Sequence, residues 1–135
     1  VAIEMALKVR KGAVYAIERK DAAVEILREN VRKFRTSNLT VVPGIAPEAC
    51  ATLPAPTHAF IGGSSGNMKD IISLLLQKNP NVRIVATAIA LESVGELTEC
   101  MKHFRFDYAE VVSMTVARNR KAALFLLFSL ETGTK

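Results

Sequence analysis

The feature that most constrains the fold is a regular alternation of helix-like and strand-like segments that closes with two consecutive strands. Stretches with apolar residues three to four positions apart predict helices, and short apolar runs between turn residues predict strands. Helices are predicted from residue 1 to a stop at Gly12 and over residues 21–34, 67–78 and 91–104, with one or two helical turns at residues 47–53. Strands are predicted over residues 13–17, 40–42, 58–61, 82–89, 109–117 and 122–130.

This order predicts an α/β protein with a Rossmann-like, mostly parallel sheet. Strict alternation places helices on both faces of a parallel sheet, and the last two strands add a C-terminal antiparallel hairpin. A chain of 135 residues, half of them hydrophobic, is long enough for one domain with one core. We therefore expect a single domain over residues 1–135, with no internal boundary.

The first helix begins without a capping residue. No Ser, Thr, Asp or Asn precedes it, although these residues usually satisfy the first backbone N–H groups of a helix. A segment in front of Val1 is therefore expected to be missing, which would make the chain a fragment of a longer protein.

Glu18 ends the first predicted strand, and ligands of this fold bind beyond the carboxyl ends of the strands. An acid there accepts hydrogen bonds from ribose hydroxyls, and its usual companion is a glycine-rich turn ~20 residues earlier. A position that far before Glu18 would precede Val1, so we expect the first strand of the fold and its glycine motif to be absent from the chain. The alternative for Glu18 is an ordinary solvated acid.

Two further segments follow strands at the same edge. Gly44-Ile45-Ala46 is small enough for backbone amides to approach a flat base, or is a simple turn. Gly62-Gly63-Ser64-Ser65-Gly66 joins a strand to a helix, and its amides suit an anion, unless it is only a permissive turn. It is not a Walker A loop, because no Gly-Lys-Ser/Thr follows.

Several other site types find no support. His58 and His103 have no partners at metal-ligand spacing, so no metal is expected. No Ser-His-Asp arrangement is suggested, and the two cysteines form no disulfide or zinc pattern. No apolar run approaches the ~20 residues that cross a bilayer, and no signal peptide is visible. We therefore expect a cytoplasmic protein.

The net charge of +5 favours an anionic partner without naming it, or reflects ordinary solubility charge. A basic cluster of Arg118, Arg120 and Lys121 occupies the predicted turn between the last two strands. This cluster either meets carboxylates of a ligand or is a solvated turn.

Taken together, five segments resemble the decarboxylating precorrin methyltransferases of cobalamin biosynthesis, the precorrin-6Y/6B C15-methyltransferase family. These are class I S-adenosylmethionine-dependent methyltransferases. The resemblance covers nearly the whole chain. The segments that carry it are Tyr15-Ala16-Ile17-Glu18-Arg19, Gly44-Ile45-Ala46-Pro47-Glu48-Ala49, Phe60-Ile61-Gly62-Gly63-Ser64, Thr87-Ala88-Ile89-Ala90-Leu91-Glu92 and Val116-Ala117-Arg118-Asn119-Arg120-Lys121.

The resemblance implies methylation of C15 of a precorrin-type macrocycle, with loss of carbon dioxide from the acetate side chain on ring C. S-adenosylmethionine would be the cofactor. An enamine-like carbon of the macrocycle can attack the methyl group directly, so catalysis would rest mainly on positioning and no general base is assigned. The cofactor-binding residues implied are Glu18, Arg19, Gly44, Ile45, Ala46, Gly62 and Gly63; the substrate-binding residues are Ser64, Arg118, Arg120 and Lys121.

The resemblance also implies a homo-oligomer, a tetramer in relatives, and fusion to a second methyltransferase domain in some of them.

Two alternatives to this function stay open. One is an RNA or small-molecule methyltransferase of the same fold, but Ile61 is not followed by an Asn/Asp-Pro-Pro-aromatic loop. Aromatic residues make up only 6% of the chain, with no Trp, so platforms for stacking bases are scarce and no nucleic-acid partner is expected. The other is a non-catalytic domain that assembles with an enzyme.

Overall fold

The computed structural model describes residues 1–64, 66–118 and 121–132. These residues form two compact units, Val1–Leu53 and Pro54–Lys135, and each is described by itself. The single domain expected from the sequence stays a prediction. No helix in the described part of the chain is long and apolar enough to span a bilayer.

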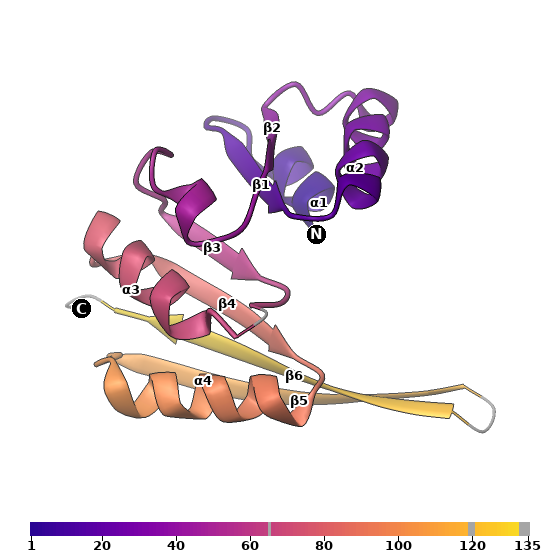
Figure 1. The fold of residues 1–135 in the computed structure, drawn as a ribbon. Helices are drawn as coiled ribbons and strands as arrows, with labels where there is room; N and C mark the ends of the chain where they lie inside the picture. Colours follow the sequence, from indigo (N-terminus) through magenta and orange to yellow (C-terminus); the bar gives the residue numbers. More distant parts are fainter. Residues whose placement is uncertain (65, 119–120, 133–135) are drawn as a thin grey trace. The chain divides into compact units, whose positions relative to one another are not determined.

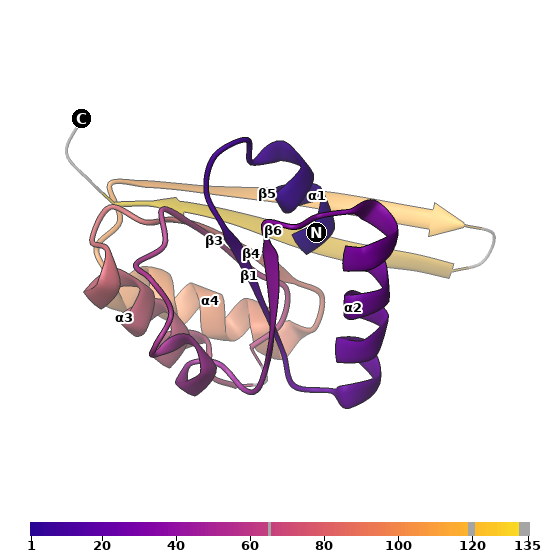
Figure 2. The same ribbon diagram turned by 90° about the horizontal axis from the view of Figure 1, so that it is seen from above.

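The first unit is a parallel pair of strands with two helices beside it (Figure 2). Its elements are α1 (Ala2–Lys8), β1 (Val14–Glu18), α2 (Asp21–Phe34), β2 (Leu39–Pro43) and the short 3₁₀ helix η1 (Glu48–Cys50). Ala6, Val14 and Leu39 form its buried centre. The Asn38 side chain donates to the carbonyls of Ala6 and Val9, which supplies partners at the end of α1.

The second unit is a four-stranded mixed sheet with two helices (Figure 1). Its elements are β3 (His58–Ile61), α3 (Met68–Lys78), β4 (Arg83–Ala88), α4 (Leu91–His103), β5 (Tyr108–Arg118) and β6 (Lys121–Glu131). The strand order is β3-β4-β6-β5. Strands β3 and β4 are parallel, and β6 is antiparallel to both of its neighbours. The predicted antiparallel hairpin at the end of an α/β chain is therefore confirmed.

Alternation along the strands builds the core of this unit. Ile84 and Ala86 of β4 are fully buried, and they lie opposite Leu130 and Phe128 of β6, which are also buried. Directly opposite residues share a face of the sheet. Helices α3 and α4 pack on this side and add the buried side chains of Ile72 and Leu97.

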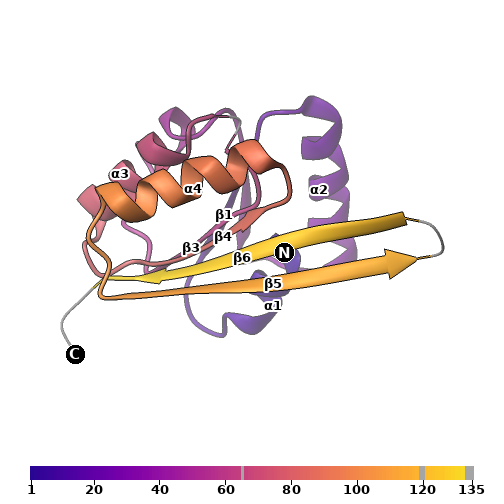
Figure 3. The same ribbon diagram turned by 90° about the horizontal axis from the view of Figure 1, so that it is seen from below.

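The hairpin outreaches the rest of its sheet (Figure 3). Ala88 ends β4 opposite Leu126, so residues 121–125 of β6 continue past β4. At ~3.4 Å per residue this extension measures about 17 Å. Because β5 runs parallel to β4, the paired residues Arg118 and Lys121 lie beyond the edge at which β3 and β4 end.

The strands form two sheets, whereas the sequence predicts one. Within the described residues, β1 pairs only with β2 and β3 pairs only with β4. Each of these two parallel strands therefore has one edge without a neighbour. The expectation of a further strand before β1 stays a prediction.

Candidate functional site

In the first unit, Glu18 and the turn after β2 lie side by side. Glu18 is in register with Pro43, and its backbone carbonyl accepts a hydrogen bond of 3.0 Å from the Gly44 amide. Parallel pairing brings the ends of both strands to one edge. The structure thus brings together Glu18 and Gly44-Ile45-Ala46, as the sequence predicts.

The Glu18 carboxylate is half-buried and oriented by the backbone. Its Oε1 accepts a hydrogen bond of 2.9 Å from the Lys20 amide. The described residues show no partner for its second oxygen, which leaves an acceptor for a hydroxyl donor. The neighbouring Arg19 is exposed.

Gly44 owes its identity to the fold of the turn. Its φ is +149°, and a Cβ built on it would lie 2.9 Å from the Ala49 Cβ. Both facts exclude a side chain there regardless of any ligand. Ile45 next to it is 52% exposed, and Ala46 is half-buried, so the turn offers an apolar surface beside Glu18.

In the second unit, the segment after β3 presents bare backbone. A Cβ built on Gly63 or on Gly66 meets nothing within 4 Å. A Cβ on Gly62 lies 3.3 Å from the Phe60 ring. Packing therefore does not require a glycine at position 63, in contrast to position 44. The backbone of Gly63 is open to a ligand.

Ser64 points inward. It is 7% exposed, and its hydroxyl donates a hydrogen bond of 2.7 Å to Glu96 Oε2 on α4. Its predicted role as a substrate contact stays a prediction, with the hydroxyl already engaged. The sequence did not single out Glu96, because nothing in the local pattern of α4 distinguishes it from the other acidic residues of this helix.

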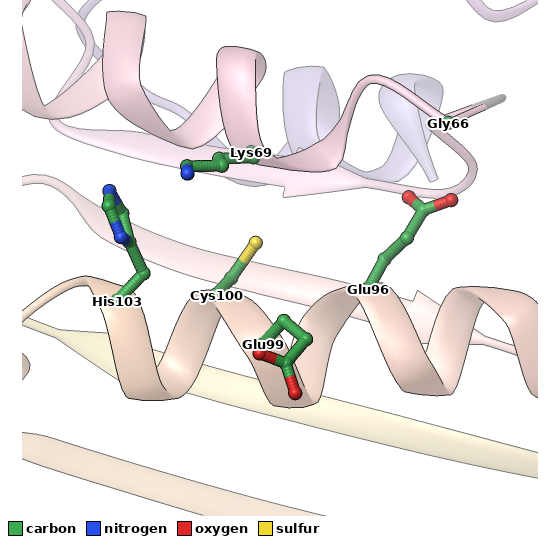
Figure 4. Close-up of a pocket in the computed structure, with 6 residues that line it drawn as sticks. All are labelled: Gly66, Lys69, Glu96, Glu99, Cys100 and His103. Carbon is green, nitrogen blue, oxygen red and sulfur yellow. The ribbon is translucent and has the colours of Figure 1, made fainter.

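A groove of about 360 Å³ lies between α3 and α4 (Figure 4). It is lined by Gly66, Lys69, Glu96, Glu99, Cys100 and His103. Burial, and next the Glu96 charge, raise the pKa of the Cys100 thiol above its usual value. In the described parts of the chain, no three His, Cys, Asp or Glu side chains are grouped to hold a metal ion.

Two residues of the basic cluster lie at the described end of the hairpin. Arg118 ends β5 and Lys121 begins β6, opposite each other in register. Arg120 lies outside the described residues. The strand directions place the backbone of Arg118 and Lys121 beyond the sheet edge that the Gly62–Ser64 segment follows, farther out along the hairpin.

A mixed sheet that ends in an antiparallel hairpin, with an acid ending one parallel strand and a glycine loop following another, defines the class. This is the fold of a class I S-adenosylmethionine-dependent methyltransferase. A solved O-methyltransferase from Bacillus cereus, in complex with SAH, shares it with a TM-score of 0.72 over 96% of this chain and 68% of that one. At 12% identity this likeness shows the fold alone.

The particular family follows from closer matches. The sequence-family model described as the precorrin methyltransferase domain matches residues 1–130, and the chain belongs to that family. A solved precorrin-6y C5,15-methyltransferase from Geobacter metallireducens GS-15 superposes with a TM-score of 0.88 at 26% identity, covering 97% of this chain and 73% of that one.

A curated relative comes from Methanothermobacter thermautotrophicus (strain Delta H). It is named a probable cobalt-precorrin-6B C(15)-methyltransferase (decarboxylating) and is 35% identical over 122 residues. The match covers 89% of this chain and 62% of the relative, so the chain spans less than two thirds of that protein's length.

Proposed function

We propose that this chain serves the S-adenosylmethionine-dependent methylation of C15 and the decarboxylation of a precorrin-type tetrapyrrole in cobalamin biosynthesis. The observation that carries the proposal is the family match over residues 1–130. The name of the Methanothermobacter relative supports the same reaction.

The residues of the first unit fit the nucleoside part of the cofactor. The unpartnered oxygen of Glu18 accepts a hydrogen bond from a ribose hydroxyl, while the Lys20 amide holds the other oxygen in place. Ile45 and Ala46 supply an apolar surface for the adenine, and the exposed Arg19 lies beside the ribose-binding acid.

In the second unit, Gly62 and Gly63 border the methyl-transfer site. When bound, S-adenosylmethionine supplies a methyl group on a positively charged sulfur. The bare backbone of Gly63 lets the reacting groups approach closely, because no side chain intervenes. The protein's contribution is then positioning, since an enamine-like carbon needs no general base to attack a methyl group.

The hairpin turn serves the substrate. A precorrin carries several carboxylates, and arginine binds a carboxylate with two parallel hydrogen bonds. We assign this role to Arg118, Arg120 and Lys121. The place of Arg118 and Lys121 at the far end of the hairpin suits the outer carboxylates of a large macrocycle.

A second copy of the chain is the partner that we propose. Within the described residues β5 pairs only with β6, and its side chains from Tyr108 to Thr115 are all exposed. Val111, Val112 and Met114 are among them, and an exposed apolar edge strand is a template for association. Pairing of two β5 edges joins two copies, and the tetramer that the resemblance implies needs a second interface. Sedimentation equilibrium should give such a dimer or the tetramer, and a monomer at micromolar concentration would contradict this proposal.

The reaction is tested with the complete polypeptide that the gene encodes, called the encoded polypeptide below. Cobalt-precorrin-6B and, separately, its cobalt-free counterpart are incubated with S-adenosylmethionine, and the products are analysed by mass spectrometry. The proposal predicts a product that has gained one methyl group and lost carbon dioxide. Methylation of RNA but of neither tetrapyrrole, or no transfer at all, would overturn it.

A further inference from the structure

The loop after β3 has little packing to hold it. Gly62, Gly63 and Gly66 make up most of it, and open space surrounds the Cβ positions of the last two. Glycine carries more backbone freedom than any other residue. A loop of this composition keeps one conformation only if something else fixes it.

Ser64 is the anchor of this loop. It is the buried residue among exposed glycines, and its carbonyl accepts a hydrogen bond of 3.1 Å from the Asn67 amide. Its hydroxyl donates to the Glu96 carboxylate at 2.7 Å, across 32 residues of sequence. A short hydroxyl–carboxylate bond is charge-assisted and stronger than one between neutral groups.

Glu96 reaches the loop from α4. In Figure 4 its side chain points away from the helix, towards the loop segment at Gly66. Glu99, one turn further along, points elsewhere and pairs with Lys102 at 2.7 Å. Of these two acids in the groove, only Glu96 holds the loop.

We propose that Glu96 is a positioning residue, which acts through Ser64 to fix the glycine loop in the conformation that its ligands require. This inference rests on the proposed function for the identity of those ligands. It gives Ser64 an anchoring role within the protein, in place of the substrate contact expected from the resemblance.

The first test measures the loop itself, without ligand or turnover. Amide hydrogen exchange is followed at Asn67, whose amide donates to the Ser64 carbonyl, in Glu96→Ala and Ser64→Ala chains. We expect faster exchange at this loop amide in both variants, with the rest of the second unit unchanged. Two comparisons complete the set: Glu96→Gln keeps an acceptor oxygen for Ser64, and Glu99→Ala removes an acid that does not touch the loop. Both should exchange like the unaltered chain.

The second test separates positioning from binding in the encoded polypeptide. In Glu96→Ala we expect kcat for tetrapyrrole methylation to fall about 10- to 100-fold, the scale of a small misplacement. The substrate KM should change little, and Glu96→Gln should restore most of kcat. The double variant with Ser64→Ala should be no slower than either single variant, because both remove one bond.

The outcomes distinguish this inference from the proposed function. An Asn67 amide that exchanges at the unaltered rate in both Glu96→Ala and Ser64→Ala would overturn the inference, as would a looser loop with unchanged kcat. A polypeptide that methylates neither tetrapyrrole overturns the proposed function instead. In that case the positioning role of Glu96 is tested without turnover. It predicts faster exchange of the loop amide and weaker binding of S-adenosylhomocysteine in Glu96→Ala. Unchanged S-adenosylhomocysteine affinity would then count against it.

Discussion

At the scale of single residues, the Glu18 carboxylate shows how a backbone prepares a side chain for binding. One oxygen is held by the Lys20 amide, so the carboxylate is oriented before any ligand arrives. We predict that Glu18→Ala in the encoded polypeptide weakens S-adenosylmethionine binding by ~1–3 kcal/mol, the scale for hydrogen bonds to a charged group. Calorimetry measures this, with the exposed Glu29→Ala as the matched control. Unchanged affinity in Glu18→Ala would remove this residue from the site.

The Cys100 thiol gives a prediction about pH. Burial is the main reason why its pKa lies above the usual value, and the Glu96 charge adds to it. A raised pKa keeps the thiol protonated, and the thiolate is the reactive form. Alkylation of Cys100 should therefore be slow at neutral pH and still rise with pH above 9.0, the ordinary value.

Peptide mass spectrometry after iodoacetamide treatment follows this reaction at Cys100. Glu96→Gln removes the neighbouring charge, so the midpoint of the pH profile should shift downwards. Labelling at neutral pH as fast as that of glutathione would contradict the burial of this thiol.

At the scale of elements, two glycines at strand ends serve different purposes. We predict that Gly44→Ala lowers the free energy of unfolding by about 1–3 kcal/mol, because its φ disfavours a side chain and Ala49 stands in the way. Gly63→Ala should change it by less than ~0.5 kcal/mol, because open space surrounds its Cβ. Its effect should instead be a loss of methylation activity. Urea unfolding and the methylation assay measure both, and the reverse pattern would show that the roles are exchanged.

The hairpin turn is the element that we connect with the substrate. Replacing Arg118, Arg120 and Lys121 together by Gln should raise the tetrapyrrole KM or lower kcat/KM. Each exposed ion pair contributes little to binding, so we expect the three residues to share the effect on the tetrapyrrole KM. Affinity for S-adenosylmethionine should stay nearly unchanged. Loss of cofactor binding with intact tetrapyrrole binding would show that the two ligands have been placed wrongly.

Local sequence signals predicted the elements well. Residues 109–117 and 122–130 are apolar runs separated by a charged turn, and the structure confirms their hairpin. The adjacency of Glu18 and Gly44 followed from the rule that parallel strands end at one edge. The bond between Ser64 and Glu96 was not predictable, because it depends on how α4 packs on the sheet, 32 residues away. Neither alternation nor charge pattern carries that information.

At the scale of the whole molecule, the division into two sheets is the feature that sequence reasoning did not foresee. Periodicity identifies strands but does not say which of them pair.

We predict that residues 1–135 alone bind S-adenosylmethionine weakly, since they contain no Gly-x-Gly-x-Gly turn to contact the methionine part. Micromolar affinity of the 135-residue chain in calorimetry would contradict this.

The position of the transferred carbon decides whether the protein carries out C15 methylation with decarboxylation. The encoded polypeptide is incubated with S-adenosylmethionine labelled with ¹³C in its methyl group and with cobalt-precorrin-6B labelled in the ring C acetate carboxyl, and the product is examined by NMR. We expect one new labelled methyl group on C15, and the acetate label recovered as carbon dioxide. A labelled methyl group elsewhere on the macrocycle, or a product that keeps the ring C carboxyl, would contradict it.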